Sequence, residues 1–259
     1  MRVSMRALVF VGAVMLPALA IAQSAPPAKA PAQKDYRTGY SRLARLPDWH
    51  GVWAPDWSTL FPRGAQRERP AGPQFTPAAA KKVADYRAGQ AEGKNTQTDA
   101  ANCVPPGMPS IMRMPYPIEF LFSPERVTII TETESQVRRI YTDGRPLPDD
   151  PDPSFNGSSV GHWEGNVLVV ETIALNPRNS LTPGINATEQ TRIVERYHED
   201  KPGTLIVDTT ITDPSLFAQP YTTKQAYVRK PDWEIREYVC QENNRDAADQ
   251  FGRPSMDIH

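Results

Sequence analysis

From Ile118 to about residue 240, apolar and polar side chains alternate in short runs that turn residues separate. Alternation with a period of two is typical of half-buried β-strands. It predicts strands at residues 120–122, 127–132, 137–141, 158–164, 167–172, 191–198, 205–212, 221–230 and 234–240. Several turns are only a few residues long, so the strands that they join must be antiparallel neighbours. We expect a mainly β fold, an antiparallel meander that closes into a barrel, with a β-sandwich as the alternative.

The chain before Ile118 has a different pattern. One helix is predicted after Thr76, a good N-cap, with Pro77 in the first turn and Gly89 as the end. Residues 49–53 alternate like a short strand with two aromatic side chains on one face. Residues 103–117 contain five prolines but also apolar side chains, which favours an extended segment packed across a sheet or over a cavity mouth.

The N-terminus has the layout of a secretory signal peptide. Arg2 and Arg6 precede an apolar run that ends in the small-residue pattern Ala20–Ala22. We therefore assign residues 1–22 to a signal peptide, 23–34 to a disordered Pro/Ala linker, and 35–259 to a single β-rich domain. Within that domain, residues 35–117 form a loop-rich part with one helix and 118–246 form the meander. A retained membrane anchor is the alternative; otherwise we expect a periplasmic or secreted protein without stable membrane insertion after cleavage.

The charge and the cysteines narrow the class of partner and the compartment. A formal net charge of −1 argues against a nucleic-acid partner and leaves a small-molecule ligand or substrate as the expected one. The two cysteines, Cys103 and Cys240, are expected to form a disulfide in an oxidising compartment, with two unpaired buried thiols as the alternative.

Several strings in the mature chain resemble a largely uncharacterised family of secreted bacterial proteins. Residues 138–145 read RRIYTDGR, and residues 157–172 read GSSVGHWEGNVLVVET. Further matches are at residues 47–53, 115–119, 194–197 and 237–243. The resemblance implies a lipocalin-like barrel and no established reaction. Relatives often have a His-Ser pair where this chain reads Gly184 to Thr188, so a role of that histidine does not carry over.

Arg138 is expected to point into the barrel, because strand side chains alternate and Ile140 belongs to the core. A buried guanidinium must be paired. Two interpretations stay open. Arg138 either holds a ligand carboxylate or forms an ion pair with a glutamate that locks the barrel geometry; the available partners are Glu119, Glu132, Glu134, Glu171 and Glu195.

The candidate chemistry is proton transfer. His162 is a possible general acid or base, and Tyr141, Asp143 and Arg139 complete a plausible catalytic set if two strands place them on one wall. No nucleophile elbow, phosphate loop or dinucleotide fingerprint is present, so we expect no organic cofactor. His50, His162 and His198 show no close pairing, so no metal site is assigned.

Three functions follow from this pattern. The first is a periplasmic β-barrel that binds a small, mainly apolar or aromatic molecule, with Arg139 or Tyr141 as polar anchor and the ligand-binding candidates Trp49, Trp53, Tyr116, Trp163 and Arg138. The second is a cofactor-free lyase, isomerase or hydrolase that acts on such a molecule by proton transfer in the barrel. The third is an envelope structural protein. All depend on a closed wall, and the first two also need room inside it.

Overall fold

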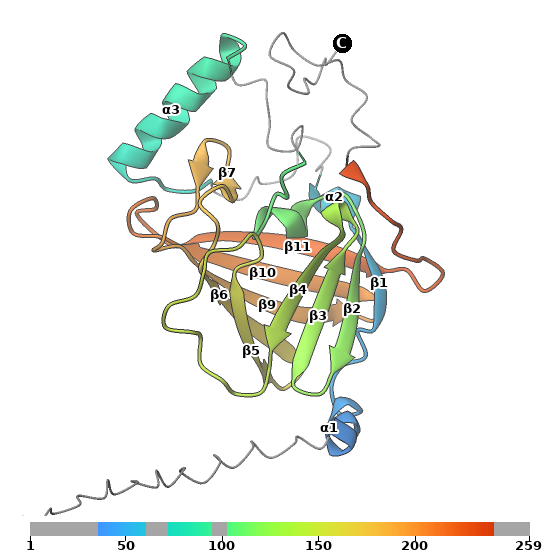
Figure 1. The fold of residues 1–259 in the computed structure, drawn as a ribbon. Coiled ribbons are helices and arrows are strands. Elements are labelled where there is room, and N and C mark those ends of the chain that lie inside the picture. The colour runs from blue at the N-terminus through green and yellow to red at the C-terminus, as the bar shows by residue number, and fades with distance from the viewer. Residues whose placement is uncertain (1–35, 61–71, 95–102, 241–259) are drawn as a thin grey trace, which may run out of the picture. The chain divides into compact units, whose positions relative to one another are not determined.

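The structure is a computed structural model that describes residues 36–60, 72–94 and 103–240. The predicted signal peptide and linker lie outside these residues. Nine strands form a closed barrel in the order β1-β11-β10-β9-β6-β5-β4-β3-β2 (Figure 1), which confirms the predicted barrel. The strands are β1 Gly51–Pro55, β2 Ile118–Ser123, β3 Arg126–Thr131, β4 Gln136–Tyr141, β5 Ser158–Glu164, β6 Val167–Ile173, β9 Arg192–Lys201, β10 Thr204–Thr212 and β11 Tyr221–Arg229. Strands β7 (Ser180–Thr182) and β8 (Ile185–Asn186) form a separate two-stranded sheet.

Neighbouring barrel strands are antiparallel at every junction but one. Strands β4 and β5 are parallel, and only Ile140↔Ser159 and Tyr141↔Val160 pair across them. A parallel pair cannot be joined by a tight turn. The Pro-rich residues 142–157 therefore run back along the wall before β5 begins. We call this short parallel junction the β4–β5 seam.

Strand β1 closes the barrel, since it pairs with β11 on one side and with β2 on the other. The prediction of a last strand at residues 234–240 is wrong, and the closure explains why. Because β1 already occupies the free edge of β11, no edge remains there for a following strand to join.

The alternation read from the sequence is the inward and outward alternation of the barrel wall. In β10 every second residue is buried, from Leu205 to Ile211. The middle of the barrel is occupied by large side chains that are at most 2% exposed: Trp53, Phe120, Arg138, Tyr197 and Tyr227. The expected ligand chamber at this place is therefore not seen in the described part of the chain.

The Pro-rich segment 103–117 packs against the barrel, as its apolar residues predict. Met108, Ile111 and Met112 are buried, and the Tyr227 hydroxyl donates to the Met112 carbonyl oxygen. The segment is not wholly extended, because a short 3-10 helix forms at Ser110–Arg113. The predicted disulfide is confirmed: Cys103 and Cys240 are bonded, with their Cα atoms 5.6 Å apart.

Helix α3 (Pro77–Ala91) begins as predicted, with the Thr76 hydroxyl accepting from the Ala79 N–H at 3.3 Å. It continues through Gly89 to a cap at Glu92, whose N–H donates to the Ala88 carbonyl. Two helices fall in a stretch that we expected to be irregular, α1 (Tyr36–Leu43) and α2 (Trp57–Leu60). None of the helices in the described ranges has the length and apolarity needed to cross a membrane.

Candidate functional site

The Arg138 side chain lies at the centre of a buried polar cluster. Its Nη1 donates to Glu195 Oε1 at 3.1 Å, and its Nη2 donates to Glu195 Oε2, so the two side chains meet fork to fork. Nη2 also donates to Thr172 Oγ1 at 2.9 Å and Nη1 to the Tyr197 hydroxyl at 3.1 Å. The cluster therefore joins β4 to β6 and β9, and Ser159 on β5 completes it.

The electrostatics of this cluster favour a fixed ion pair. Burial alone would lower the pKa of Arg138, but the attraction of Glu195 and the Tyr197 oxygen outweighs it and raises that pKa. Burial and the Glu195 charge raise the pKa of Tyr197, so its hydroxyl stays protonated and donates to Glu195 Oε1 at 2.8 Å. This arrangement is the Arg–Glu pair that was one of the two interpretations of Arg138. It occupies both Nη atoms and leaves neither for a ligand.

The four residues suggested for proton transfer are not gathered in one cavity. Arg139 and Tyr141 point outward from β4 and line a cavity of about 570 Å³ on the outside of the barrel. Asp143 binds Arg145, with 2.7 Å between Oδ2 and Nη2. His162 points outward from β5, is exposed, and lies 3.2 Å from Glu164. Proton transfer in the barrel by this set therefore has no geometric support.

The predicted aromatic residues divide into two groups. Trp49 and Trp163 lie with ring centroids 5.3 Å apart, and Trp53 is fully buried with its indole N–H donating to the Trp49 carbonyl at 2.9 Å. Tyr116 instead packs on Tyr238 at 5.9 Å. Three of the four predicted aromatics thus belong to one region, in which Trp163 borders open space.

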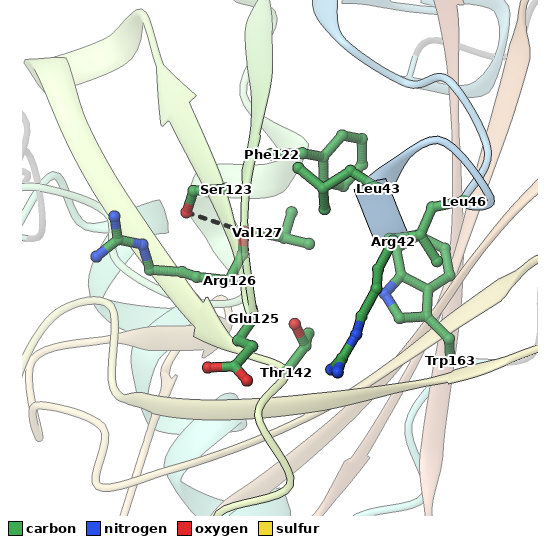
Figure 2. Close-up of a pocket in the computed structure, with 10 residues that line it drawn as sticks. All are labelled: Arg42, Leu43, Leu46, Phe122, Ser123, Glu125, Arg126, Val127, Thr142 and Trp163. Atoms are coloured by element: carbon green, nitrogen blue, oxygen red, sulfur yellow. Dashed lines mark hydrogen bonds between the residues drawn. The ribbon is translucent and has the colours of Figure 1, made fainter. Parts of the chain in front are cut away.

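That space is a cavity of about 180 Å³ at one end of the barrel, which we call the barrel-end cavity (Figure 2). Its walls come from helix α1 and the residues after it, the β2–β3 turn, the end of β4 and the end of β5. The apolar lining residues are Leu43, Leu46, Phe122, Val127 and Trp163, and the polar ones are Arg42, Ser123, Glu125, Arg126 and Thr142. The cavity is therefore amphipathic.

Two hydrogen-bond donors at this cavity are buried and have no partner in the part of the chain that the structure describes. They are the Trp163 indole N–H and the Arg126 Nε–H. In Figure 2 the Arg126 guanidinium extends away from Trp163, whereas the Trp163 ring faces the other lining residues. An unpaired buried donor costs about 1–3 kcal/mol, so an acceptor that reaches Trp163 removes that cost.

The Arg42 side chain gives the cavity a cationic edge. Among the residues that the structure describes, its guanidinium has no hydrogen-bond or ion-pair partner. In Figure 2 the Arg42 side chain runs toward the end of the cavity where the polar side chains of Glu125 and Thr142 lie. The cavity thus combines an apolar wall, a neutral donor and a cation, with the Glu125 carboxylate at the same end as the cation.

The sequence pointed to Trp163 but not to the rest of this cavity. Phe122 and Val127 read as ordinary strand residues, and Arg42, Leu43 and Leu46 lie in or next to a helix that we did not predict. The segment Tyr36–Leu43 has a glycine in its middle, which disfavours a helix, but Tyr36, Tyr40 and Leu43 stand at helical spacing, a signal that the prediction did not use.

The described residues contain no group of three or more His, Cys, Asp or Glu side chains placed to hold a metal ion. No protein-family model matches the chain, and no curated protein is significantly similar to it.

Proposed function

We propose that this protein acts outside the cytoplasm and binds a small, mainly apolar organic acid in the barrel-end cavity. The observation that carries the proposal is the buried Trp163 indole N–H, which has no partner among the described residues and belongs to a side chain that lines this cavity. The closed barrel supplies a rigid frame for such a site, and barrels of this kind commonly hold one small ligand.

The size of the cavity limits the ligand. At about 180 Å³ it is smaller than the pockets that hold drug-sized molecules, roughly 300–1,000 Å³. An apolar cavity of about 150 Å³ accommodates benzene. The proposed ligand therefore has a single ring or a short branched chain.

The polarity of the lining indicates an acid. Phe122, Val127 and the two leucines of the lining provide a wall for an apolar body, while Trp163 and Arg42 provide donors. A carboxylate accepts from both a neutral N–H and a guanidinium, and charge-assisted bonds of this kind are among the stronger ones. Benzoate combines this body and this acceptor at the right size.

The compartment rests on two features. The disulfide between Cys103 and Cys240 suits an oxidising environment, and the first 22 residues have the composition of a signal peptide. Membership of the secreted bacterial family that the RRIYTDGR string resembles is part of the same proposal.

Native mass spectrometry of the processed chain, purified from the compartment to which its own host exports it, tests the proposal. We expect a mass excess of roughly 100–200 Da, the range of single-ring acids that such a volume admits. Trp163→Phe should lose the excess mass because it removes the indole N–H. The control Trp57→Phe, which changes an exposed ring that does not line the cavity, should keep it. The bare mass of the processed wild-type chain, or full retention by Trp163→Phe, would count against the proposal.

A further inference from the structure

We infer that the cavity on the outside of the β4–β5 seam is a second binding site, and that its ligand is an amino-acid-type compound with a carboxylate and an ammonium group. We call it the outer-wall cavity. It shares no lining residue with the barrel-end cavity. The inference therefore does not depend on the proposed function.

The outer-wall cavity has a volume of about 570 Å³, within the range of small-molecule sites. Its floor is the outward face of the seam, with Val137, Arg139 and Tyr141 from β4 and Val160 from β5. Residues 145–149, 154 and 156–159 form the remaining wall. The seam offers only two residue pairs across it, so the long connection needs other contacts to keep its place over the wall.

These contacts fix the wall in advance of binding. The Arg145 guanidinium stacks on the Tyr141 ring, with Cζ 4.0 Å from the ring centroid. Asp143 holds the same guanidinium through Nε at 2.9 Å and Nη2 at 2.7 Å. The Asp143 carboxylate thereby neutralises the charge of Arg145. Arg145 lines the cavity, and its charge is not left for a ligand.

Arg139 is the cation that remains for a ligand. Its side chain is exposed at the cavity, and within the described ranges it has no hydrogen-bond or ion-pair partner. A guanidinium offers a planar fork of donors that matches a carboxylate. Arg139 thus indicates where the anionic group of a ligand binds.

Acceptors on the same cavity call for a donor on the ligand. Asn156 Oδ1 is buried and has no hydrogen-bond partner within residues 36–60, 72–94 and 103–240. Its orientation is fixed because Asn156 Nδ2 donates to Gln136 Oε1 at 3.3 Å, while Gln136 Nε2 donates to the Glu134 carbonyl at 3.1 Å. Asp149, the one carboxylate among the lining residues, adds a negative charge. An ammonium group satisfies both.

The apolar lining residues of the outer-wall cavity indicate that the ligand also carries an apolar group. Val137, 38% exposed although it is apolar, faces this cavity together with Leu147 and Val160. A ligand with an apolar side chain would remove this surface from water. A free apolar amino acid carries the carboxylate, the ammonium group and the side chain in one molecule.

The test compares three probes that differ by one charged group. L-phenylalanine has both groups, 3-phenylpropionate lacks the ammonium and phenethylamine lacks the carboxylate. In amide-detected NMR titrations of the full processed chain, we expect saturable shifts at Arg139, Ser158 and the Asn156 side-chain amide with L-phenylalanine. Each of the other two probes should bind at these positions at least about tenfold more weakly, as loss of one charge-assisted contact implies.

Two variants complete the test. Arg139→Gln should weaken L-phenylalanine binding at least about tenfold. The matched control Arg196→Gln, which changes an exposed wall arginine that pairs with Glu164 away from the cavity, should leave binding unchanged. Equal binding by Arg139→Gln and wild type, equal binding of all three probes, or no saturable shift at these positions would overturn the inference. Signals from the Trp163 indole report the barrel-end cavity separately.

Discussion

Asp213 shows how a buried carboxylate is stabilised by neutral donors alone. It is 2% exposed and accepts from the Thr188 and Thr191 hydroxyls at 2.6 and 2.7 Å and from the Ser215 hydroxyl at 2.6 Å. Burial would raise its pKa, but the bonds from Ser215, Thr188 and Thr191 together outweigh that effect and lower the pKa below its ordinary value. The charged form of Asp213 therefore stabilises the fold.

We predict that Asp213→Asn lowers the free energy of unfolding by roughly 2 kcal/mol at pH 7, the scale of hydrogen bonds to a charged group. Because the folded pKa is lowered, this contribution is complete above the unfolded value of about 3.9 and is lost as the pH falls through the folded pKa. Urea unfolding of both chains at pH 7 and at descending acid pH measures the difference. A difference that stays constant, or grows, in acid would contradict the assignment.

At the residue scale, the sequence predicted the orientation of a side chain better than the identity of its interaction partner. Alternation placed Arg138 inward, as the structure has it, whereas Arg139, which we also considered as an anchor for a ligand in the barrel, points outward. The partner of Arg138 could not be chosen among five glutamates. Glu195 becomes the partner only through the register of β6 with β9 and of β5 with β6, which no local pattern encodes.

The β4–β5 seam is the element that most needs support from side chains. Only two residue pairs join these strands, so few ladder hydrogen bonds hold the barrel closed there. The Arg138 cluster links β4 to β5, β6 and β9. We interpret this cluster as the set of side-chain contacts that holds β4 and β5 together at the seam.

A double-mutant cycle tests this interpretation. Arg138→Met alone should cost about 3–5 kcal/mol of stability, because it leaves the Glu195 charge buried and unpaired, and Glu195→Leu alone should cost a similar amount. The double variant should recover most of that loss, since two apolar residues fill the site without a charge. Breaking the exposed Arg196–Glu164 pair should have a much smaller effect. Additive losses in the double variant would show that the two side chains do not act as a pair.

Helix α3 depends on its N-cap. The Thr76 hydroxyl accepts from the Ala79 N–H and also donates to the Ser215 carbonyl at 3.0 Å. Thr76→Ala should therefore destabilise the protein by about 1 kcal/mol or somewhat more, measured by thermal or urea unfolding. Thr76→Ser keeps both bonds and should stay close to wild type; an equal loss in both variants would rule out the cap as the cause.

At the element scale, strands with clear alternation were found within a few residues of their ends, and the parallel seam was not. A parallel pair leaves no turn signal, since its partners are joined by a long connection. Helix α1 was missed although Tyr36, Tyr40 and Leu43 have helical spacing, because the segment is only eight residues long and has a glycine in its middle. Helices this short are marginal alone, and α1 contacts β2.

Two long-range links stabilise the whole molecule. Strand β1 completes the barrel, and the disulfide joins the Pro-rich segment to the end of the described chain. The Cys103–Cys240 bond spans 137 residues. On the chain-entropy argument a loop of this length stabilises the fold by about 4–5 kcal/mol. The Cys103→Ser/Cys240→Ser double variant should show a correspondingly lower unfolding midpoint in guanidinium, and the wild-type chain should move to the same midpoint in reductant. Coincident oxidised and reduced midpoints would contradict the contribution.

Turns and alternation predicted an antiparallel meander that closes into a barrel or folds into a sandwich, and the structure shows the barrel; the position of the open space was not predictable. Arg138, Tyr197 and the large aromatics fill the middle of the barrel, and the cavities lie at its end and on its outer wall. The volumes of the side chains that share each level of the barrel decide where open space remains. Which side chains share a level depends on the register of all nine strands at once.

The central claim is that the Trp163 indole N–H binds an acceptor of a small organic acid. The most direct measurement is the indole N–H region of a ¹H–¹⁵N NMR spectrum during titration with benzoate. We expect the Trp163 signal to shift saturably and the Trp53 signal, whose N–H already donates to the Trp49 carbonyl, to stay in place. A Trp163 signal that does not move, or one that moves no more than that of exposed Trp57, would contradict the account.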